Sequence, residues 1–423
     1  MFEPSTVSIV IFVLAYILFV VFPHRRTWIA VAAALLLVAL GVLTWRQALQ
    51  AVNWNVMGIF VGTLVIADSF MDSRVPAYIA ERVVNHSKNT CWAILWICIL
   101  ASALSAFVEN VATVLIMAPI ALALARKLKI DPTNMLIAIA IASNLQGTAT
   151  LIGDPPSMLL GGFAKMTFMD FFFYRGRPSI FFAVELGAIC SFVVLYFLFK
   201  RHAEKAEVVG VERVRSWVPT VILGLLIVAL ALSSFFDVGF TSLAGQICMV
   251  FALVTVIWEK WTNQKCIHQS IRALDWDTTF FLMSVFIIVG SITSTGWIER
   301  IAVALSALMG TNIFAGYTIM VFLAVALSAF VDNVPFLAAM LPVAITVSDK
   351  LQVNPSLFLF GLLIGASLGG NVTPIGASAN IVACGLLKKE GYPVRFGHFV
   401  KIGLPFTLVA VAAGYLFVWF VWK

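Results

Sequence analysis

The chain has 423 residues, of which 62% are hydrophobic and only 11% are charged, and its net charge is +7. Soluble domains carry about a quarter charged residues, so this composition excludes an ordinary soluble protein and indicates a chain that lies largely in lipid. The basic residues stand singly or in pairs at the ends of apolar runs, which is typical of membrane topology signals and excludes a nucleic-acid-binding surface.

The first half, residues 1–202, is predicted to contain single apolar spans, one double-length segment and one segment broken by glycine and proline. In chain order these are spans at 7–22, 27–43 and 54–70, an amphipathic stretch to about 86, the double segment 90–128, the broken segment 133–165 and a span at 178–199. One crossing needs about 20 apolar residues, so the double segment, with its polar midpoint, predicts a re-entrant helical hairpin.

A linker at 203–216, expected in the cytoplasm, leads to a second half, residues 217–423, that repeats this order. Its elements are spans at 217–233, 238–259 and 276–292, an arm to about 310, the hairpin 313–350, the broken segment 355–388 and a span at 402–421. The residues repeat as well, because Ser105-Ala106-Phe107-Val108-Glu109-Asn110-Val111 recurs 223 positions later as Ser328-Ala329-Phe330-Val331-Asp332-Asn333-Val334. A constant shift over so many residues indicates a duplication.

These elements predict an all-α polytopic membrane protein of about ten transmembrane helices and two re-entrant hairpins. Five crossings in each half would invert the second half relative to the first. One orientation places 20 of the 27 Lys and Arg residues, Arg25 and Arg26 among them, on the cytoplasmic side, as the positive-inside rule requires. We therefore expect a multi-pass protein of the plasma (inner) membrane with both termini outside.

Two matched carboxylates, Glu109 and Asp332, stand at the predicted hairpin tips, each followed by an asparagine. A carboxylate in a low dielectric is costly unless it is paired, protonated or bound to a cation, so both are candidates for proton coupling. The alternative is a helix cap, in which the carboxylate accepts from backbone N–H groups, although Asn110 and Asn333 could form the caps instead.

Two further acidic residues, Asp154 and Glu185, have no acidic counterpart in the other half. Asp154 precedes Pro155, the arrangement of an N-cap with proline at the first helical position, so a cap and a binding role are both open. Glu185 lies within a span, where it could relay protons or simply face a polar neighbour.

The two broken segments carry the remaining candidate binding residues. In lipid, freed backbone groups are tolerated only where protein or a water-filled cavity satisfies them, and together with polar side chains they can replace an ion's hydration shell. The alternative is that the glycines serve close helix packing. The candidates are Thr113, Ser143, Asn144, Gly147, Thr148, Thr150, Ser367, Gly370, Asn371, Thr373, Ser378 and Asn380, with Na+ expected near Asn110, Asn144, Asn333 and Asn371.

These motifs resemble those of the ion-transporter superfamily, which includes arsenite permeases, sodium/proton antiporters of the NhaD type and divalent-anion/sodium symporters. The similarity covers almost the whole chain and is greatest to the arsenite-permease branch that also contains the P protein. It is carried by Glu109-Asn110-Val111-Ala112-Thr113, residues 147–156, Asp332-Asn333-Val334-Pro335 and residues 369–380. The resemblance implies an elevator-type carrier, with a scaffold of outer spans and a mobile unit of hairpins and broken helices.

The resemblance also bears on the cargo. In the symporter branch each hairpin tip carries Ser-Asn-Thr, whereas the tips here begin with Glu109 and Asp332, so like charges would repel a dicarboxylate unless protons or cations intervene. We expect an ion-coupled secondary transporter, with proton-coupled arsenite or antimonite efflux first, a Na+/H+ antiporter second and an anion carrier (dicarboxylate, citrate, sulfate) third. A gated channel is an alternative of another class.

Enzyme activity is not expected, because the sequence has no HExxH, Walker or GxSxG motif. No cofactor is expected beyond H+ or Na+ as the coupling ion. The partners considered are membrane lipid, a second copy of the chain and, for an arsenite pump, a soluble ATPase subunit.

Overall fold

The computed structural model describes residues 3–202, 204, 213–237, 239–262, 272, 274–309 and 312–423, so most of the predicted linker lies outside the described residues. The described chain is nearly all helical, which confirms the all-α fold class, apart from the short paired strands β1 (Phe173–Tyr174) and β2 (Arg177–Pro178). Within the described residues, nine helices are long and apolar enough to cross a membrane, or ten if one bent pair is a single span.

The helices of the first half follow the predicted order. They are α1 (Pro4–Val21), η1 (Pro23–Arg25), α2 (Arg26–Ala39), α3 (Trp45–Ala51), α4 (Trp54–Asp72), α5 (Val75–Asn85), α6 (Thr90–Ser105), α7 (Asn110–Leu128), α8 (Thr133–Gly147), α9 (Pro155–Ala164), η2 (Met169–Phe171) and α10 (Ile180–Phe199).

The span expected at 27–43 is shorter than predicted. α2 has 14 residues, which is about 21 Å of helix, whereas the hydrocarbon core of a bilayer is about 30 Å thick. The helix ends early because Gly41, at φ 73°, takes the left-handed conformation that terminates many helices, and its N–H bonds back to the carbonyl of Val38. The chain then enters α3, a helix that was not predicted.

The second half repeats the arrangement of the first. Its described helices are α11 (Val218–Ser233), α12 (Leu243–Thr262), α14 (Trp276–Ser294), α15 (Trp297–Met309), α16 (Ile313–Ser328), α17 (Asn333–Leu351), α18 (Pro355–Gly369), η3 (Gly370–Val372), α19 (Ser378–Lys389) and α20 (Phe396–Trp422). Asparagine caps mark equivalent starts, since Asn89 Oδ1 accepts from Trp92 N–H at α6 and Asn312 Oδ1 from Ala315 N–H at α16.

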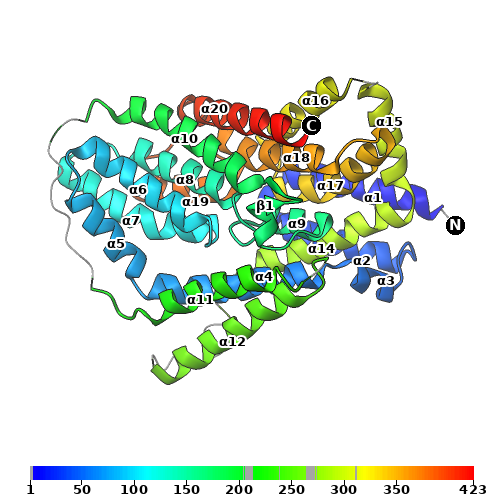
Figure 1. Ribbon diagram of the computed structural model, residues 1–423, viewed down its shortest axis with the longest axis horizontal. Coiled ribbons are helices and arrows are strands. Elements are labelled where there is room, and N and C mark those ends of the chain that lie inside the picture. The colour runs from blue at the N-terminus through cyan, green and yellow to red at the C-terminus, as the bar shows by residue number, and fades with distance from the viewer. Residues whose placement is uncertain are drawn as a thin grey trace.

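The two double-length segments form the helix pairs α6–α7 and α16–α17, with turns at residues 106–109 and 329–332. Figure 1 shows the first pair toward one end of the molecule and the second pair toward the other. Each pair packs on the broken segment of its own half, α6 on α8 and α16 on α18. The second helix of each pair also contacts the other half, α7 against α19 and α17 against α9, so both turns reach the same central region.

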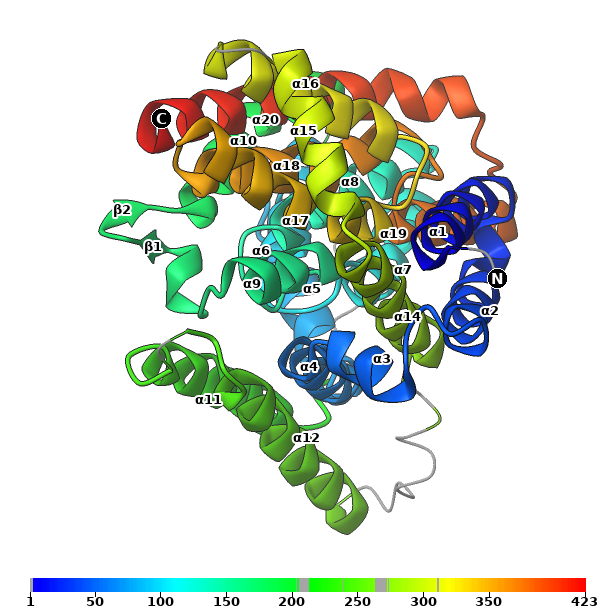
Figure 2. The ribbon, with the colours of Figure 1, turned by 90° about the vertical axis from the view of Figure 1, so that its right-hand side faces the viewer.

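The remaining long helices surround this central unit. α12 packs along α4, and α2 packs along α14, so helices from the two halves pack on each other in the outer layer. Figure 2 shows α11 and α12 on one flank of the molecule, beside α4, with α10 and α20 on the opposite side. α20 packs against α10 and α18, which places the last helix next to the second broken segment.

Candidate functional site

A polar cavity of about 190 Å³ lies where the two hairpin turns meet the two broken segments. Among the described residues, its lining combines five carboxylates with a single basic side chain. The charged residues are Glu109, Asp154, Asp275, Asp277, Asp332 and Arg26, and the other polar ones are Asn110, Asn144, Thr278, Asn333 and Ser378. The predicted tip residues of both hairpins therefore share one cavity.

Glu109 and Asp332 occupy equivalent positions at the starts of α7 and α17. A carboxylate oxygen of Glu109 accepts from Ala112 N–H at 3.1 Å, and one of Asp332 accepts from Val334 N–H at 3.0 Å. The cap interpretation is thus confirmed for both carboxylates, whereas the suggestion that Asn110 and Asn333 form the caps is wrong. Because both carboxylates also line the cavity, capping fixes their position and does not exclude a role in binding.

Two serine hydroxyls donate hydrogen bonds to Asn110. Ser105 Oγ donates to Asn110 Oδ1 at 2.5 Å, and Ser143 Oγ lies 2.9 Å from Ser105 Oγ and 3.2 Å from the Asn110 carbonyl oxygen. The Asn110 side chain lines the cavity together with Asp154. Asp154 is the N-cap residue of α9 with proline directly after it, as predicted, but its side chain makes no cap hydrogen bond to α9 and lines the cavity instead.

Three buried asparagines join the two halves beside the cavity. Asn144 Nδ2 donates to Asn371 Oδ1 at 2.8 Å and to Asn380 Oδ1 at 2.9 Å. Asn371 Nδ2 donates in turn to the Ile141 carbonyl at 3.1 Å, and Asn380 Nδ2 donates to the Thr373 carbonyl at 2.9 Å. Asn144 lines the cavity, and its bonds to Asn371 and Asn380 hold its side chain in place.

Most of the other residues that were predicted to bind in the broken segments do not line the cavity. Thr150 and Thr373 donate to the carbonyls of Ala106 and Ala329, which ties each break to the hairpin turn of its own half. A Cβ at Gly147 would clash with the Asn110 side-chain amide, which would have to move to admit it. The predicted residues outside the lining are Thr113, Ser143, Gly147, Thr148, Thr150, Glu185, Ser367, Gly370, Asn371, Thr373 and Asn380.

Two of these predicted residues, Thr113 and Ser367, bury hydroxyl groups that have no hydrogen-bond partner among the described residues. Glu185 lies apart from the cavity, in a groove between α6 and α10. There it accepts a hydrogen bond from Gln146, which lies in the last turn of α8. The structure therefore does not bring Glu185 together with Glu109 and Asp332.

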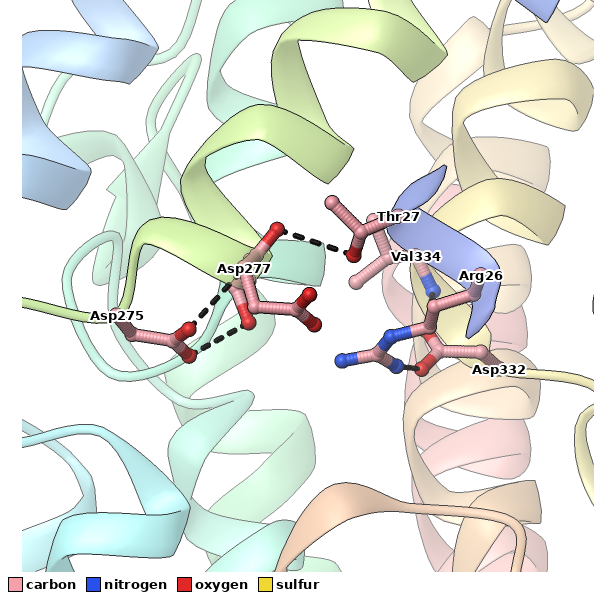
Figure 3. A network of polar contacts seen from close by, with 7 residues as sticks. Arg26, Thr27, Asp275, Asp277, Asp332 and Val334 are labelled. Carbon is pink, nitrogen blue, oxygen red and sulfur yellow. Dashed lines mark hydrogen bonds and ion pairs between the residues drawn. The ribbon is translucent and has the colours of Figure 1, made fainter. Parts of the chain in front are cut away.

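Arg26, expected to be a surface charge that marks topology, instead lines the cavity. Its guanidinium forms an ion pair with the Asp332 carboxylate and lies 4.9 Å from the centre of the Phe281 ring. Figure 3 shows this pair beside the start of α14. No sequence motif signals the contact, because 306 positions separate the two residues.

Asp275 and Asp277 were also missed. Asp275 caps α14, accepting from Thr278 N–H at 3.0 Å and from Thr278 Oγ1 at 2.6 Å, while Thr27 Oγ1 donates to the Asp277 backbone carbonyl at 3.2 Å. A signal existed, since Asn53-Trp54-Asn55 stands at the start of α4 much as Asp275-Trp276-Asp277 stands at the start of α14. The second half thus carries acids where the first carries amides.

The carboxylates surround the cavity and do not converge on one point. Within the part of the chain that the structure describes, no group of three His, Cys, Asp or Glu side chains is close enough to hold a metal ion.

Comparison with known proteins places this chain in a family. The model of the citrate transporter family, CitMHS, matches residues 16–269 and 266–423. An uncharacterized transporter of Mycobacterium tuberculosis is 28% identical over 424 residues, covering 98% of both chains. The P protein of Sus scrofa is 24% identical over 97% of this chain and 58% of that protein.

Two solved structures share the fold. The YdaH transporter of Alcanivorax borkumensis aligns with a TM-score of 0.62 at 14% identity, over 98% of this chain and 97% of that one. MtrF of Neisseria gonorrhoeae aligns with a TM-score of 0.60 at 13% identity, over 100% of this chain and 95% of that one. With the family match over nearly the full length, these findings show that the chain is a multi-pass membrane transporter, not an enzyme, and belongs to the CitMHS citrate transporter family of the ion-transporter superfamily.

Proposed function

We propose that the chain is a secondary carrier driven by a cation gradient, and that the carboxylate-lined cavity binds the coupling proton or Na+. The observation that supports this is the charge of the described lining, five carboxylates against one guanidinium. Once Arg26 is paired with Asp332, the other four carboxylates have no basic side chain among these lining residues. Such a set of like charges becomes stable when protons or cations bind among them.

The cargo that suits this cavity is small and adds no uncompensated negative charge. Proton-coupled efflux of arsenite or antimonite remains our first candidate, because the motifs resemble the arsenite-permease branch. In their undissociated form both are uncharged hydroxides, which the carboxylates of the cavity would not repel. Direct Na+/H+ exchange is the second, because the carboxylates themselves could carry both ions.

A citrate-type carrier is the alternative that the family match favours. Arg26 offers the only guanidinium among the described lining residues, so a free tricarboxylate would meet more negative than positive charge. Citrate would therefore have to enter together with protons or a metal cation that neutralises part of its charge.

Purified protein in proteoliposomes tests the coupling role of the cavity. Glu109→Gln should reduce the pH-stimulated rate about 10-fold or more, in the range of typical coupling energies. Glu299→Gln, the same change at an exposed position on α15, should behave as wild type. An unaltered pH or Na+ dependence in Glu109→Gln protein that folds normally would contradict the proposal.

The cargo is identified with the same preparation. Uptake of arsenite, Na+ and citrate, the last with and without Mg²⁺, is compared under imposed proton and Na+ gradients. Arsenite uptake driven by a proton gradient supports the first candidate, Na+ flux without another solute supports antiport, and citrate uptake that needs a cation supports the third. Single-channel currents would exclude a carrier.

A further inference from the structure

The two hairpin turns are related by the duplication but have different electrostatic neighbours. Asp332, at the second turn, is paired with Arg26. Glu109, at the first turn, lines the same cavity as Asp154, whose equivalent position in the second half is Ala377. One turn therefore has a built-in positive charge, and the other has an additional negative charge.

Arg26 is held in this position by the outer helices. It is the first residue of α2, and the next residue, Thr27, donates to the Asp277 carbonyl, which joins the starts of α2 and α14. The Phe281 ring supports the guanidinium from one side. The second hairpin turn is fixed nearby, because Tyr16 Oη of α1 donates to the Pro335 carbonyl at 2.6 Å.

We propose that Arg26 is a tethered cation that fills the second hairpin turn, so that the cavity takes up a free coupling cation only at the first turn, beside Glu109 and Asp154. A guanidinium stays charged at any physiological pH, and a free ion could reach Asp332 only by displacing it. This inference rests on the proposed function and adds which carboxylates bind the free cation.

Asp277 gives the guanidinium a second acidic neighbour. Figure 3 shows its carboxylate directed toward Arg26 from the start of α14. Arg26 thus pairs with Asp332, and the Asp277 carboxylate is directed toward the same guanidinium. Its removal would leave Asp332 and Asp277 facing the same space without a counter-charge, a pair that would attract a free cation.

Removal of Arg26 should therefore create a second site for a free cation. Transport by Arg26→Gln protein should depend on cation concentration more steeply than wild type, with the Hill coefficient rising from about 1 toward about 2. The double variant Arg26→Gln/Asp332→Asn removes both charges and should return the curve to wild-type steepness. Arg25→Gln is the matched control, since Arg25 is exposed, precedes Arg26 and does not line the cavity.

The measurement is initial transport rate against Na+ concentration and against pH, for reconstituted protein whose folding is checked by thermal unfolding. An Arg26→Gln curve as shallow as wild type would overturn the inference. If that variant does not fold, the Asp332→Asn variant alone tests the inference. Its rate should depend on cation concentration as steeply as the wild type, because the free cation binds at Glu109. Loss of cation dependence would place that cation at Asp332 and overturn the inference.

Failure of the proposed function gives a different result. If wild-type transport responds to neither Na+ nor protons, cation coupling is wrong for this protein, and the inference falls with it. If the wild type responds and the Arg26 variants do not differ from it, only the role of Arg26 is wrong.

Discussion

Asn144 hydrogen-bonds two asparagines of the second half beside the cavity. Its single amide nitrogen serves the side-chain oxygens of both Asn371 and Asn380, and all three side chains are buried. A buried acceptor without its donor loses the interactions that it would have in water. The amide cluster therefore contributes to stability as well as to the shape of the cavity.

Asn144→Ala should destabilise the protein by about 1–3 kcal/mol for each acceptor left without a donor. Thermal unfolding in detergent measures this. Asn134→Ala serves as the control, because Asn134 Oδ1 lies 2.7 Å from His398 Nε2 at an exposed site, where water can replace the lost bond. Equal unfolding temperatures for Asn144→Ala and wild type would show that the amide bonds are not needed for stability.

The duplication explains which cavity residues could be predicted from the sequence. Glu109 and Asp332 were found because the same heptapeptide pattern occurs twice, and a duplicated polar tip within an apolar segment is costly in lipid unless it has a role. Arg26 was assigned to the surface because charge patterning counts residues near span ends and contains no information on long-range contacts. Only the three-dimensional packing of α2 on α14 brings it to the second turn.

The broken segments and the hairpin turns pack through equivalent glycines in the two halves. A Cβ at Gly153 would lie 2.8 Å from the Ser105 carbonyl oxygen, and one at Gly376 would lie 3.0 Å from the Ala329 carbonyl oxygen. Backbone atoms cannot move aside as side chains can, so each break can approach its hairpin turn this closely only with glycine. The close packing of these glycines is therefore part of how the cavity is built.

Gly376→Ala should separate the second break from its hairpin turn and reduce both transport and thermal stability. The added methyl group would lie 2.6 Å from the Gly370 carbonyl oxygen, a contact that requires the backbone to shift. Small-to-large changes in tight packing typically cost about 1–3 kcal/mol. Gly224→Ala in α11 has no atom within 4 Å of the new methyl group and should be tolerated. Full activity of Gly376→Ala would contradict this account of the turn.

At the level of elements, the two helix pairs and the two breaks lie where they were predicted, because an apolar run of twice the spanning length with a polar midpoint has few stable conformations in lipid. The prediction failed where apolar composition continues beyond the helix. The run at 27–43 is apolar throughout, yet α2 stops at Ala39, because Gly41 takes a left-handed conformation that hydrophobicity does not encode. The β1–β2 pair was missed because each strand has only two residues.

For the molecule as a whole, the contacts of the repeats converge on one centre. Helices of each half contact the break of the other half, so the cavity would not exist in either half alone. The elevator movement implied by the family resemblance would carry the hairpins and breaks past the outer helices. Since Arg26 belongs to an outer helix and Asp332 to a hairpin, such a movement would have to break their ion pair.

The distribution of basic residues predicts that both chain ends face the outside of the cell. Figure 1 shows both ends in the same half of the molecule, away from α5. Tags placed at either end should therefore react with membrane-impermeant reagents in intact cells, whereas a tag in the linker at 203–216 should react only after permeabilisation. Protection of either terminal tag in intact cells would contradict this orientation.

The central claim, that the cavity carboxylates bind the coupling cation, is tested most directly by carbodiimide labelling of the purified wild type followed by mass spectrometry. A carbodiimide modifies protonated carboxyl groups in apolar surroundings and does not react with cation-bound carboxylates. We predict that Glu109 or Asp154 is modified and that transport is lost in parallel with this modification. The extent of labelling should decrease as the pH or the concentration of the coupling cation rises. Labelling of neither residue, or labelling that no cation or pH alters, would contradict the claim.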